Sequence, residues 1–344
     1  MHIFHNRRTQ NRHVAVELHA GEIIQPLESP TRVDMILDRI RTSGVGAVHD
    51  ITLHGLDAIK AVHDAAYVDF IQTAWHDWHA AGRQGHVLPT GSPARRTRQD
   101  KIPQDIVGKL GYYALAADTA IDEGTFDAAT ASADIALSAM DHVLASGDPA
   151  FALCRPPGHH AASDQLGGYC LFNNAAITAQ AARLKGVERV AIFDVDYHHG
   201  NGTQEIFYER DDVLFTSIHC DPDLEFPYYL GYADETGSKD GIGYTHNFPL
   251  AKGTTYAQWQ QAFGKALEAI ERFDPGLLII SLGVDTYIGD PLGTFTLSSD
   301  DFTDYGRRLA ALQRPTVFLM EGGYAVEDIG VNVVNVLGGF DSGS

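Results

Sequence analysis

The sequence predicts an α/β fold in which parallel strands alternate with helices in a doubly wound sheet. Two observations support this prediction. Short apolar runs rich in β-branched residues recur along the chain, and between them lie longer stretches with the spacing of amphipathic helices. Strands that alternate with helices of this length form βαβ units and give a mainly parallel sheet. The expected strands are 150–154, 190–195, 213–218, 277–282 and 315–320.

Helical periodicity begins near the N-terminus and continues to the end of the chain. The expected helices are 33–44, 56–79, 111–121, 126–146, 173–185, 256–272, 300–312 and 326–337. Ser29 and Pro30 precede the first of them, as is typical of a helix start, and Gly44 ends it. Because neither an internal repeat nor a linker divides the sequence, we expect a single domain over residues 1–344.

Residues 82–109 interrupt this pattern, because glycines and prolines break up regular elements there. The segment has six basic residues and only two acidic ones, in a protein whose net charge is −20. The basic residues are Arg83, Arg95, Arg96, Arg98, Lys101 and Lys109. A loop of this length in a compact domain is usually functional or disordered. We expect either a solvated loop or an arm that docks against an acidic neighbour, such as a second copy of the chain.

The overall composition argues against several classes of protein. A hydrophobic content of 44% is typical of a globular protein, and the charge of −20 argues against nucleic-acid binding but suits a cationic substrate. The three cysteines are widely spaced and form no zinc or disulfide pattern. The first residues lack a secretory signal, and the longest apolar run, 277–284, is too short to span a membrane. We therefore expect a cytoplasmic protein that binds neither nucleic acid nor membranes.

Candidate metal ligands follow two of the predicted strands. Asp194, Asp196 and His198 come at the end of the run 190–195, on one side of the chain while it stays extended. Open α/β sheets bind ligands at the carboxyl ends of their strands, and unpaired buried carboxylates are very costly, so a bound cation is the simplest explanation. Asp285 follows the strand 277–282. Together with Asp196 and His198 it gives three ligands and an open position, as in catalytic zinc sites.

Two other strand ends carry groups suited to catalysis. His159 and His160 lie in the turn CRPPGHHA, and Tyr324 lies in MEGGYA. Each motif alone is weak, since paired histidines are often core or surface residues and glycine pairs commonly form turns. Beside a metal that activates water, the two histidines fit as general base and acid, and the tyrosine can donate to a developing oxyanion. The combination predicts metal-assisted hydrolysis of an amide or a related carbonyl compound.

Four motifs resemble the signatures of the histone-deacetylase-like branch of the arginase/deacetylase superfamily: RPPGHHA, DVDYHHGNGTQ, GVDTYIGDPLG and EGGY. The resemblance runs from about Pro30 to Gly338, and it is greatest to the bacterial acetylpolyamine amidohydrolases. It implies a three-layer α/β/α deacetylase domain with a central, mainly parallel eight-stranded sheet. It also implies an enzyme that deacetylates acetylputrescine, acetylcadaverine or longer acetylated polyamines by attack of metal-bound water, giving acetate and free amine.

The resemblance also implies a role for each polar residue of the site. One Zn²⁺ per chain would be bound by Asp196, His198 and Asp285. His159 and His160 would carry out the proton transfers, and Tyr324 would polarise the substrate carbonyl. Asp194 corresponds to the acidic partner of His159, and Asn201 to the partner of His160. A neutral amide stabilises protonated His160 less than a carboxylate would.

Further residues correspond to the family's structural potassium sites, of which one or two per chain are expected. The inner site corresponds to Asp194, Asp196, His198, Ser217 and Ile218. The outer site corresponds to Phe207, Arg210, Val213 and Tyr244.

The substrate tunnel of the family has counterparts as well. Gly168, Tyr169 and Phe226 correspond to its walls, and Asp118 to an acidic residue at its rim. Arg32 resembles an arginine beneath the site, where a structural role is equally compatible with the sequence. The insertion at 82–109 corresponds to one that mediates dimerisation and narrows the entrance, which implies a homodimer.

Three alternatives remain open. The same site can serve a deacylase of acetyl-lysine proteins, peptides or other small amides. An arginase-like enzyme with two Mn²⁺ would need more bridging aspartates than this sequence offers. A catalytically inactive binding scaffold would retain the motifs without turnover.

Overall fold

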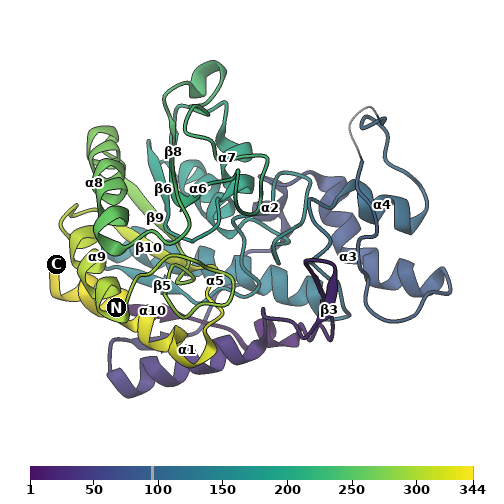
Figure 1. Ribbon diagram of the computed structural model, residues 1–344, viewed down its shortest axis with the longest axis horizontal. Coiled ribbons are helices and arrows are strands. Elements are labelled where there is room, and N and C mark those ends of the chain that lie inside the picture. Colours follow the sequence, from purple (N-terminus) through teal and green to yellow (C-terminus); the bar gives the residue numbers. More distant parts are fainter. Residues whose placement is uncertain (94–96, 344) are drawn as a thin grey trace.

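The computed structural model of the protein describes residues 1–93 and 97–343. Its centre is an eight-stranded sheet in the order β4–β1–β5–β10–β9–β6–β7–β8, and every neighbouring pair is parallel (Figure 1). The strands are β1 (His2–Phe4), β4 (Ala47–His49), β5 (Ala150–Ala152), β6 (Val190–Asp194), β7 (Val213–Cys220), β8 (Thr245–Leu250), β9 (Leu277–Leu282) and β10 (Thr316–Met320). A separate antiparallel hairpin joins β2 (Glu17–His19) to β3 (Glu22–Ile24). The expected α/β fold with eight parallel strands is confirmed.

The central strands are buried on both faces. All residues of β6, β7, β9 and β10 are buried, and most are aliphatic or aromatic. A parallel sheet that is covered on both sides requires such near-continuous apolar runs. This is why these four strands are recognisable in the sequence.

Helices form a layer on each face of the sheet (Figure 1). One layer consists of α5 (Thr125–Ser146), α6 (Asn174–Leu184) and α7 (Asn201–Phe207). The other consists of α1 (Pro30–Ser43), α8 (Tyr256–Phe273), α9 (Ser299–Ala310) and α10 (Val326–Gly343). The remaining elements are α2 (Leu56–Lys60), α3 (Ala65–Ala80), α4 (Ile106–Tyr112) and the 3₁₀ turns Arg7–Asn11 and Lys239–Gly241. None of the helices in the described part of the chain has an apolar stretch long enough to cross a bilayer.

Two expected helices differ from the structure. The expected helix 56–79 is divided into α2 and α3, because the Asp64 side chain accepts a hydrogen bond from Ala66 N (2.7 Å) and starts a new helix there. The expected helix 111–121 is wrong, since α4 ends at Tyr112 and an irregular segment follows. Tertiary contacts override the helix propensity of its alanines: Leu115 N donates to a distant carbonyl, and Ile121 forms a bridge to another segment.

Strands β1, β4 and β8, the hairpin β2–β3 and helix α7 were not expected from the sequence. β1 and β4 are only three residues long, so they show no apolar run. β8 lies at the opposite edge of the sheet from β4 and contains a proline, a residue that strands tolerate mainly at edges. Short and edge strands therefore lack the signal that identifies the central ones.

Among the described residues of the insertion at 82–109, those in a helix lie at its end, where α4 begins at Ile106. Within its described residues, an isolated bridge also joins Val87 to Ile121. The basic residues Arg95 and Arg96 lie outside the described part of the chain. In Figure 1, α3 and α4 lie at the end of the molecule opposite α8 and α9.

A buried cluster of charges lies beside the turn that follows β10. Glu28 contacts three arginines that are almost completely buried: Arg12 (2.7 Å), Arg155 (2.7 Å) and Arg32 (3.3 Å). Burial would raise the pKa of Glu28, but the three guanidinium groups lower it to about 2. Arg32 also donates to the carbonyls of Glu321 (2.6 Å) and Gly323 (2.7 Å), so it holds the turn that carries Tyr324.

Candidate metal centre and active site

Four adjacent strands bring the expected site residues together. β5, β10, β9 and β6 are neighbours in this order and run in the same direction. His159 follows β5, Tyr324 follows β10, Asp285 follows β9, and Asp196 follows β6. Parallel strands end at the same edge of a sheet, so all four groups meet at the carboxyl edge, where α/β proteins bind their ligands.

Asp196, His198 and Asp285 present three possible ligand atoms to one point. His198 Nδ1 lies 3.3 Å from Asp196 Oδ1 and 3.2 Å from Asp285 Oδ2. Ligands at ~2.0–2.1 Å from a tetrahedral zinc ion are about 3.3–3.4 Å apart, so these separations fit Zn²⁺. Burial, together with the Asp196 carboxylate, raises the pKa of Asp285 to about 7. A cation between the two carboxylates would relieve this repulsion, and the donor set therefore fits the expected metal.

Backbone N–H groups hold the two carboxylates in place. Tyr197 N donates to Asp285 Oδ1 (2.9 Å), and Gly322 N donates to Asp196 Oδ2 (2.8 Å). A Cβ atom at Gly322 would lie 2.6 Å from Asp196 Oδ2, and a Cβ at Gly283 would collide with the same carboxylate. Both positions need glycine because the backbone approaches Asp196 so closely.

His159 and His160 have different partners. His159 Nδ1 lies 2.9 Å from Asp194 Oδ2, whereas His160 Nδ1 lies 2.7 Å from Asn201 Oδ1. Both partner atoms are acceptors, so each ring donates its Nδ1–H and keeps Nε2 as its second nitrogen. The expected pairings of Asp194 with His159 and of Asn201 with His160 are both present.

The pKa values of the two histidines shift in opposite directions. Burial would lower the pKa of His159, but the carboxylates of Asp196 and Asp194 raise it to about 10. Burial lowers the pKa of His160 well below its usual value, and the neighbouring histidines add to this effect. The hydrogen bond to Asn201 acts in the opposite direction and raises this pKa, so the low value comes from burial and the neighbouring histidines and not from the neutral partner.

A cavity of about 550 Å³ opens at this edge of the sheet. Its lining includes His160, His198, Tyr324, Gly168, Tyr169 and Phe226. The ring of Phe226 lies 4.9 Å from that of His160, and the ring of Tyr169 lies 5.6 Å from that of Tyr324, so aromatic rings flank the polar groups. Asp118 also lines the cavity, and its Oδ1 accepts hydrogen bonds from Gly168 N (3.0 Å) and Thr119 Oγ1 (2.7 Å). The four expected substrate residues thus share one cavity with the expected catalytic groups.

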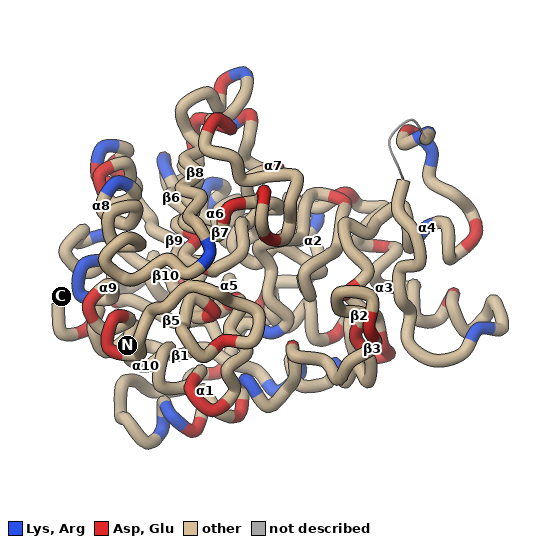
Figure 2. The backbone as a smooth tube through the Cα atoms, viewed as in Figure 1, with Lys and Arg blue, Asp and Glu red and all other residues tan. Residues whose placement is uncertain are grey.

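Three buried carboxylates that support the site were missed by sequence reasoning. Glu321 Oε2 accepts two backbone N–H groups of the histidine turn (2.7 and 3.2 Å). Asp290 Oδ2 accepts two backbone N–H groups at Tyr324 (2.6 and 3.1 Å), and Glu17 Oε1 accepts the Tyr169 hydroxyl (2.5 Å). Glu321 and Asp290 belong to motifs that were recognised for other residues. Glu17 lies on the unexpected hairpin, whose acidic residues appear in Figure 2, and it gave no signal.

The two sets of residues expected for potassium lie in separate places. Asp194 on β6 is in register with Ser217 on β7, and Ile218 follows on the same strand. The second set surrounds the α7–β7 turn and the start of β8: Phe207, Arg210, Val213 and Tyr244. Tyr244 O accepts a hydrogen bond from Phe215 N (2.9 Å), which joins the segment before β8 to β7.

Residues 26–340 match the histone deacetylase domain, and the chain therefore belongs to this family of deacetylases and amidohydrolases. It is 52% identical over 325 residues to acetylpolyamine amidohydrolase 2 of Pseudomonas aeruginosa, with 94% of each chain covered. It is 48% identical over 328 residues to the acetylpolyamine amidohydrolase of Mycoplana ramosa, covering 95% of this chain and 96% of that one. The crystal structure of an acetylpolyamine aminohydrolase from Burkholderia pseudomallei is similar over 100% of this chain and 99% of that chain, with a TM-score of 0.94 at 35% identity. The expected family is confirmed.

Proposed function

We propose that the protein is a Zn²⁺-dependent amidohydrolase that removes the acetyl group from acetylated polyamines and releases acetate and a free amine. One observation carries the proposal: three metal-ligand atoms, two of them 3.2 and 3.3 Å from His198 Nδ1, lie beside a cavity lined by His160 and Tyr324. The similarity to proteins named acetylpolyamine amidohydrolases supports the substrate class.

Asp196, His198 and Asp285 hold the zinc ion in this proposal. When bound, Zn²⁺ supplies Lewis acidity, which lowers the pKa of a coordinated water to ~7 and polarises a carbonyl group. The backbone hydrogen bonds to both carboxylates orient the ligand atoms in advance, and such outer partners commonly affect metal affinity.

His160 accepts the proton of the attacking water. Its low pKa keeps the imidazole neutral at neutral pH, and its Nδ1–H is engaged by Asn201, so the lone pair is on Nε2. Once protonated, this weakly basic ring is a strong enough acid to protonate the leaving nitrogen. His159 lies behind it, with the two ring centres 4.0 Å apart, and its pairing with Asp194 makes it the second proton carrier of the site.

The cavity wall positions the substrate. Tyr324 remains protonated because burial raises its pKa well above the usual value, so its hydroxyl can donate to the oxyanion that develops on the carbonyl. Tyr169 and Phe226 present aromatic surface to the methylene chain next to the scissile amide. Asp118 supplies a carboxylate for the distal ammonium group of a polyamine, a group that acetyl-lysine within a peptide lacks.

Two further features belong to this proposal. Structural K⁺ would bind near Asp194 and Ser217, and a second ion at the α7–β7 turn. The insertion at 82–109 would form a homodimer contact and narrow the entrance, because its basic residues complement the acidic remainder of the chain.

The test compares kcat/KM of the zinc-loaded enzyme on acetylputrescine, acetylcadaverine and acetyl-lysine peptides. We expect higher values on the polyamines, and we expect D118N to raise KM for them while E123Q, an exposed neighbour, leaves it unchanged. Equal or better turnover of the peptides would refute the polyamine assignment but leave the amide chemistry intact.

A further inference from the structure

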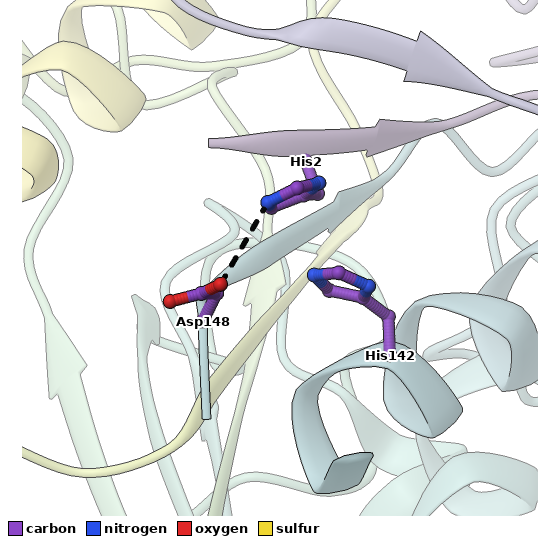
Figure 3. A group of neighbouring side chains, drawn as sticks. All are labelled: His2, His142 and Asp148. Atoms are coloured by element: carbon purple, nitrogen blue, oxygen red, sulfur yellow. Dashed lines mark ion pairs between the residues drawn. The ribbon is translucent and has the colours of Figure 1, made fainter. Parts of the chain in front are cut away.

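A second group of metal-type ligands lies at the amino-terminal ends of β1 and β5, whereas the catalytic cavity lies at the carboxyl ends of the strands. His2 begins β1, His142 lies near the end of α5, and Asp148 lies in the turn just before β5 (Figure 3). The catalytic histidines follow the carboxyl end of β5, whereas this group sits at its amino end. The two sites are therefore separated by the length of the strand.

The ligand atoms of these three residues converge. One atom from each of His2, His142 and Asp148 lies within 4.8 Å of the other two. His2 Nε2 is 3.9 Å from Asp148 Oδ2, and the ring centres of His2 and His142 are 4.0 Å apart. Two ligand atoms of one zinc ion lie about 3.3–3.4 Å apart. A small movement of the Asp148 carboxylate towards His2 would therefore bring their 3.9 Å separation to the distance that zinc ligands need. Its side chain is 65% exposed and is free to make that movement.

A fourth residue orients His2. This residue is His49, the last residue of β4, and its Nε2 lies 3.0 Å from Nδ1 of His2. When His2 donates this Nδ1–H to His49, the lone pair of His2 is on Nε2, the nitrogen that faces Asp148. Metal-binding histidines usually have such an acceptor on their second ring nitrogen, which fixes the tautomer.

The alternative is a group of surface histidines paired with a carboxylate. Three imidazole rings packed 4.0–6.4 Å apart would repel one another when protonated. The turn that carries Asp148 is also held, because Asp148 N donates to Ser146 Oγ (3.0 Å). Closely packed rings that disfavour protonation, beside an adjustable carboxylate on an ordered turn, suit a bound cation better than a solvated surface.

We propose that His2, His142 and Asp148 form a second metal site for Zn²⁺ or a similar borderline transition-metal cation, with His49 as its outer partner. Two imidazoles and one carboxylate are ligands that such ions prefer over Mg²⁺ or Ca²⁺. A bound ion would connect β1, α5 and the turn before β5, and through His49 the edge strand β4. Its role is to fasten the N-terminal strand and the sheet edge to the helical layer, independently of the reaction.

The experiment counts zinc in the protein without an affinity tag. The protein is equilibrated with Zn²⁺ and passed through a desalting column, and zinc per chain is then measured by plasma mass spectrometry. We expect two ions in the wild type, one in H142A and one in D148N, with amide hydrolysis unchanged in both variants. The matched control, H76A, removes an exposed histidine of α3 and should retain two ions.

Two further variants separate this site from the catalytic one. In D285N the second ion should remain although hydrolysis is lost. In H49A the affinity for the second ion should fall by about 10–100-fold, as is typical for loss of an outer partner. Should the wild type hold no more zinc than D148N at every concentration tested, the second site does not exist. A wild type that fails to hydrolyse any acetylated amine but still exceeds D148N by one zinc would refute only the proposed function.

Discussion

Asn201 offers a direct way to test which histidine acts as the base. In the wild type its neutral Oδ1 accepts the Nδ1–H of His160 at 2.7 Å, and both side chains are buried. N201D keeps the size and the acceptor but places a negative charge on the partner. The substitution therefore changes the electrostatics of His160 with little change in its position.

The size of the effect follows from Coulomb's law. A charge about 4 Å from the imidazolium contributes about 4 kcal/mol at an effective dielectric constant of about 20, which corresponds to about 3 pKa units. The cost of burying the new carboxylate reduces this gain, so we expect the pKa of His160 to rise by about 1–3 units. His160 must be neutral to accept a proton, and a higher pKa therefore moves the acid limb of the pH profile to higher pH.

The assay is the pH dependence of kcat/KM on acetylputrescine for the wild type, N201D and N201A. N201D should lose activity first at low pH and approach the wild type at high pH. N201A removes the acceptor without adding charge, so its activity should fall at all pH values while the limb stays in place. An N201D profile whose acid limb coincides with that of the wild type would falsify the assignment of His160 as the base.

Other substitutions test the remaining parts of the site and the fold. Y324F should reduce kcat by about 10²–10³-fold because an oxyanion donor is lost, while zinc content stays the same. D285N should lose the catalytic zinc and with it turnover, as metal analysis and the deacetylation assay will show. E28Q should lower the free energy of unfolding by about 3–5 kcal/mol in urea titrations, since it leaves three buried guanidinium groups without their carboxylate. Burial lowers the pKa of His63 to about 4, so the unfolded chain binds this proton at higher pH than the folded one. The free energy of unfolding should therefore fall as the pH drops from about 6.5 to about 4, by up to about 3 kcal/mol from His63, and H63Q should weaken this dependence in denaturant titrations at several pH values.

The sequence predicts those parts of the fold whose signal is local. The central strands are found because a parallel sheet covered on both faces needs continuous apolar runs, as in Leu277–Leu282. The expected helix 111–121 failed because the conformation there depends on contacts with residues far away in the chain. Propensity cannot include such contacts. The three-residue strands β1 and β4 are too short to show any period.

The same distinction applies to the site. The metal ligands Asp196, His198 and Asp285 and the histidine pair occur in motifs directly after predicted strands. Because α/β proteins bind ligands at the carboxyl ends of their parallel strands, the sequence predicted that these residues lie close together. Glu321 and Asp290 accept backbone N–H groups from other segments, and only the three-dimensional structure reveals those partners. Sequence motifs thus identified groups with possible chemistry, but not the carboxylates that hold the turns carrying them.

The hydrogen bond from Gly322 N to Asp196 spans 126 positions of the chain, and this has a consequence for synthesis. A growing chain that already contains β6 and β9 still lacks β10, which lies between β5 and β9 in the sheet. Until β10 is made, β5 and β9 lack the strand that lies between them, and Tyr324 and the Gly322 donor to Asp196 are missing. Translation must therefore pass beyond residue 324 before the active site can assemble. A chain released earlier carries the metal ligands without a finished enzyme around them.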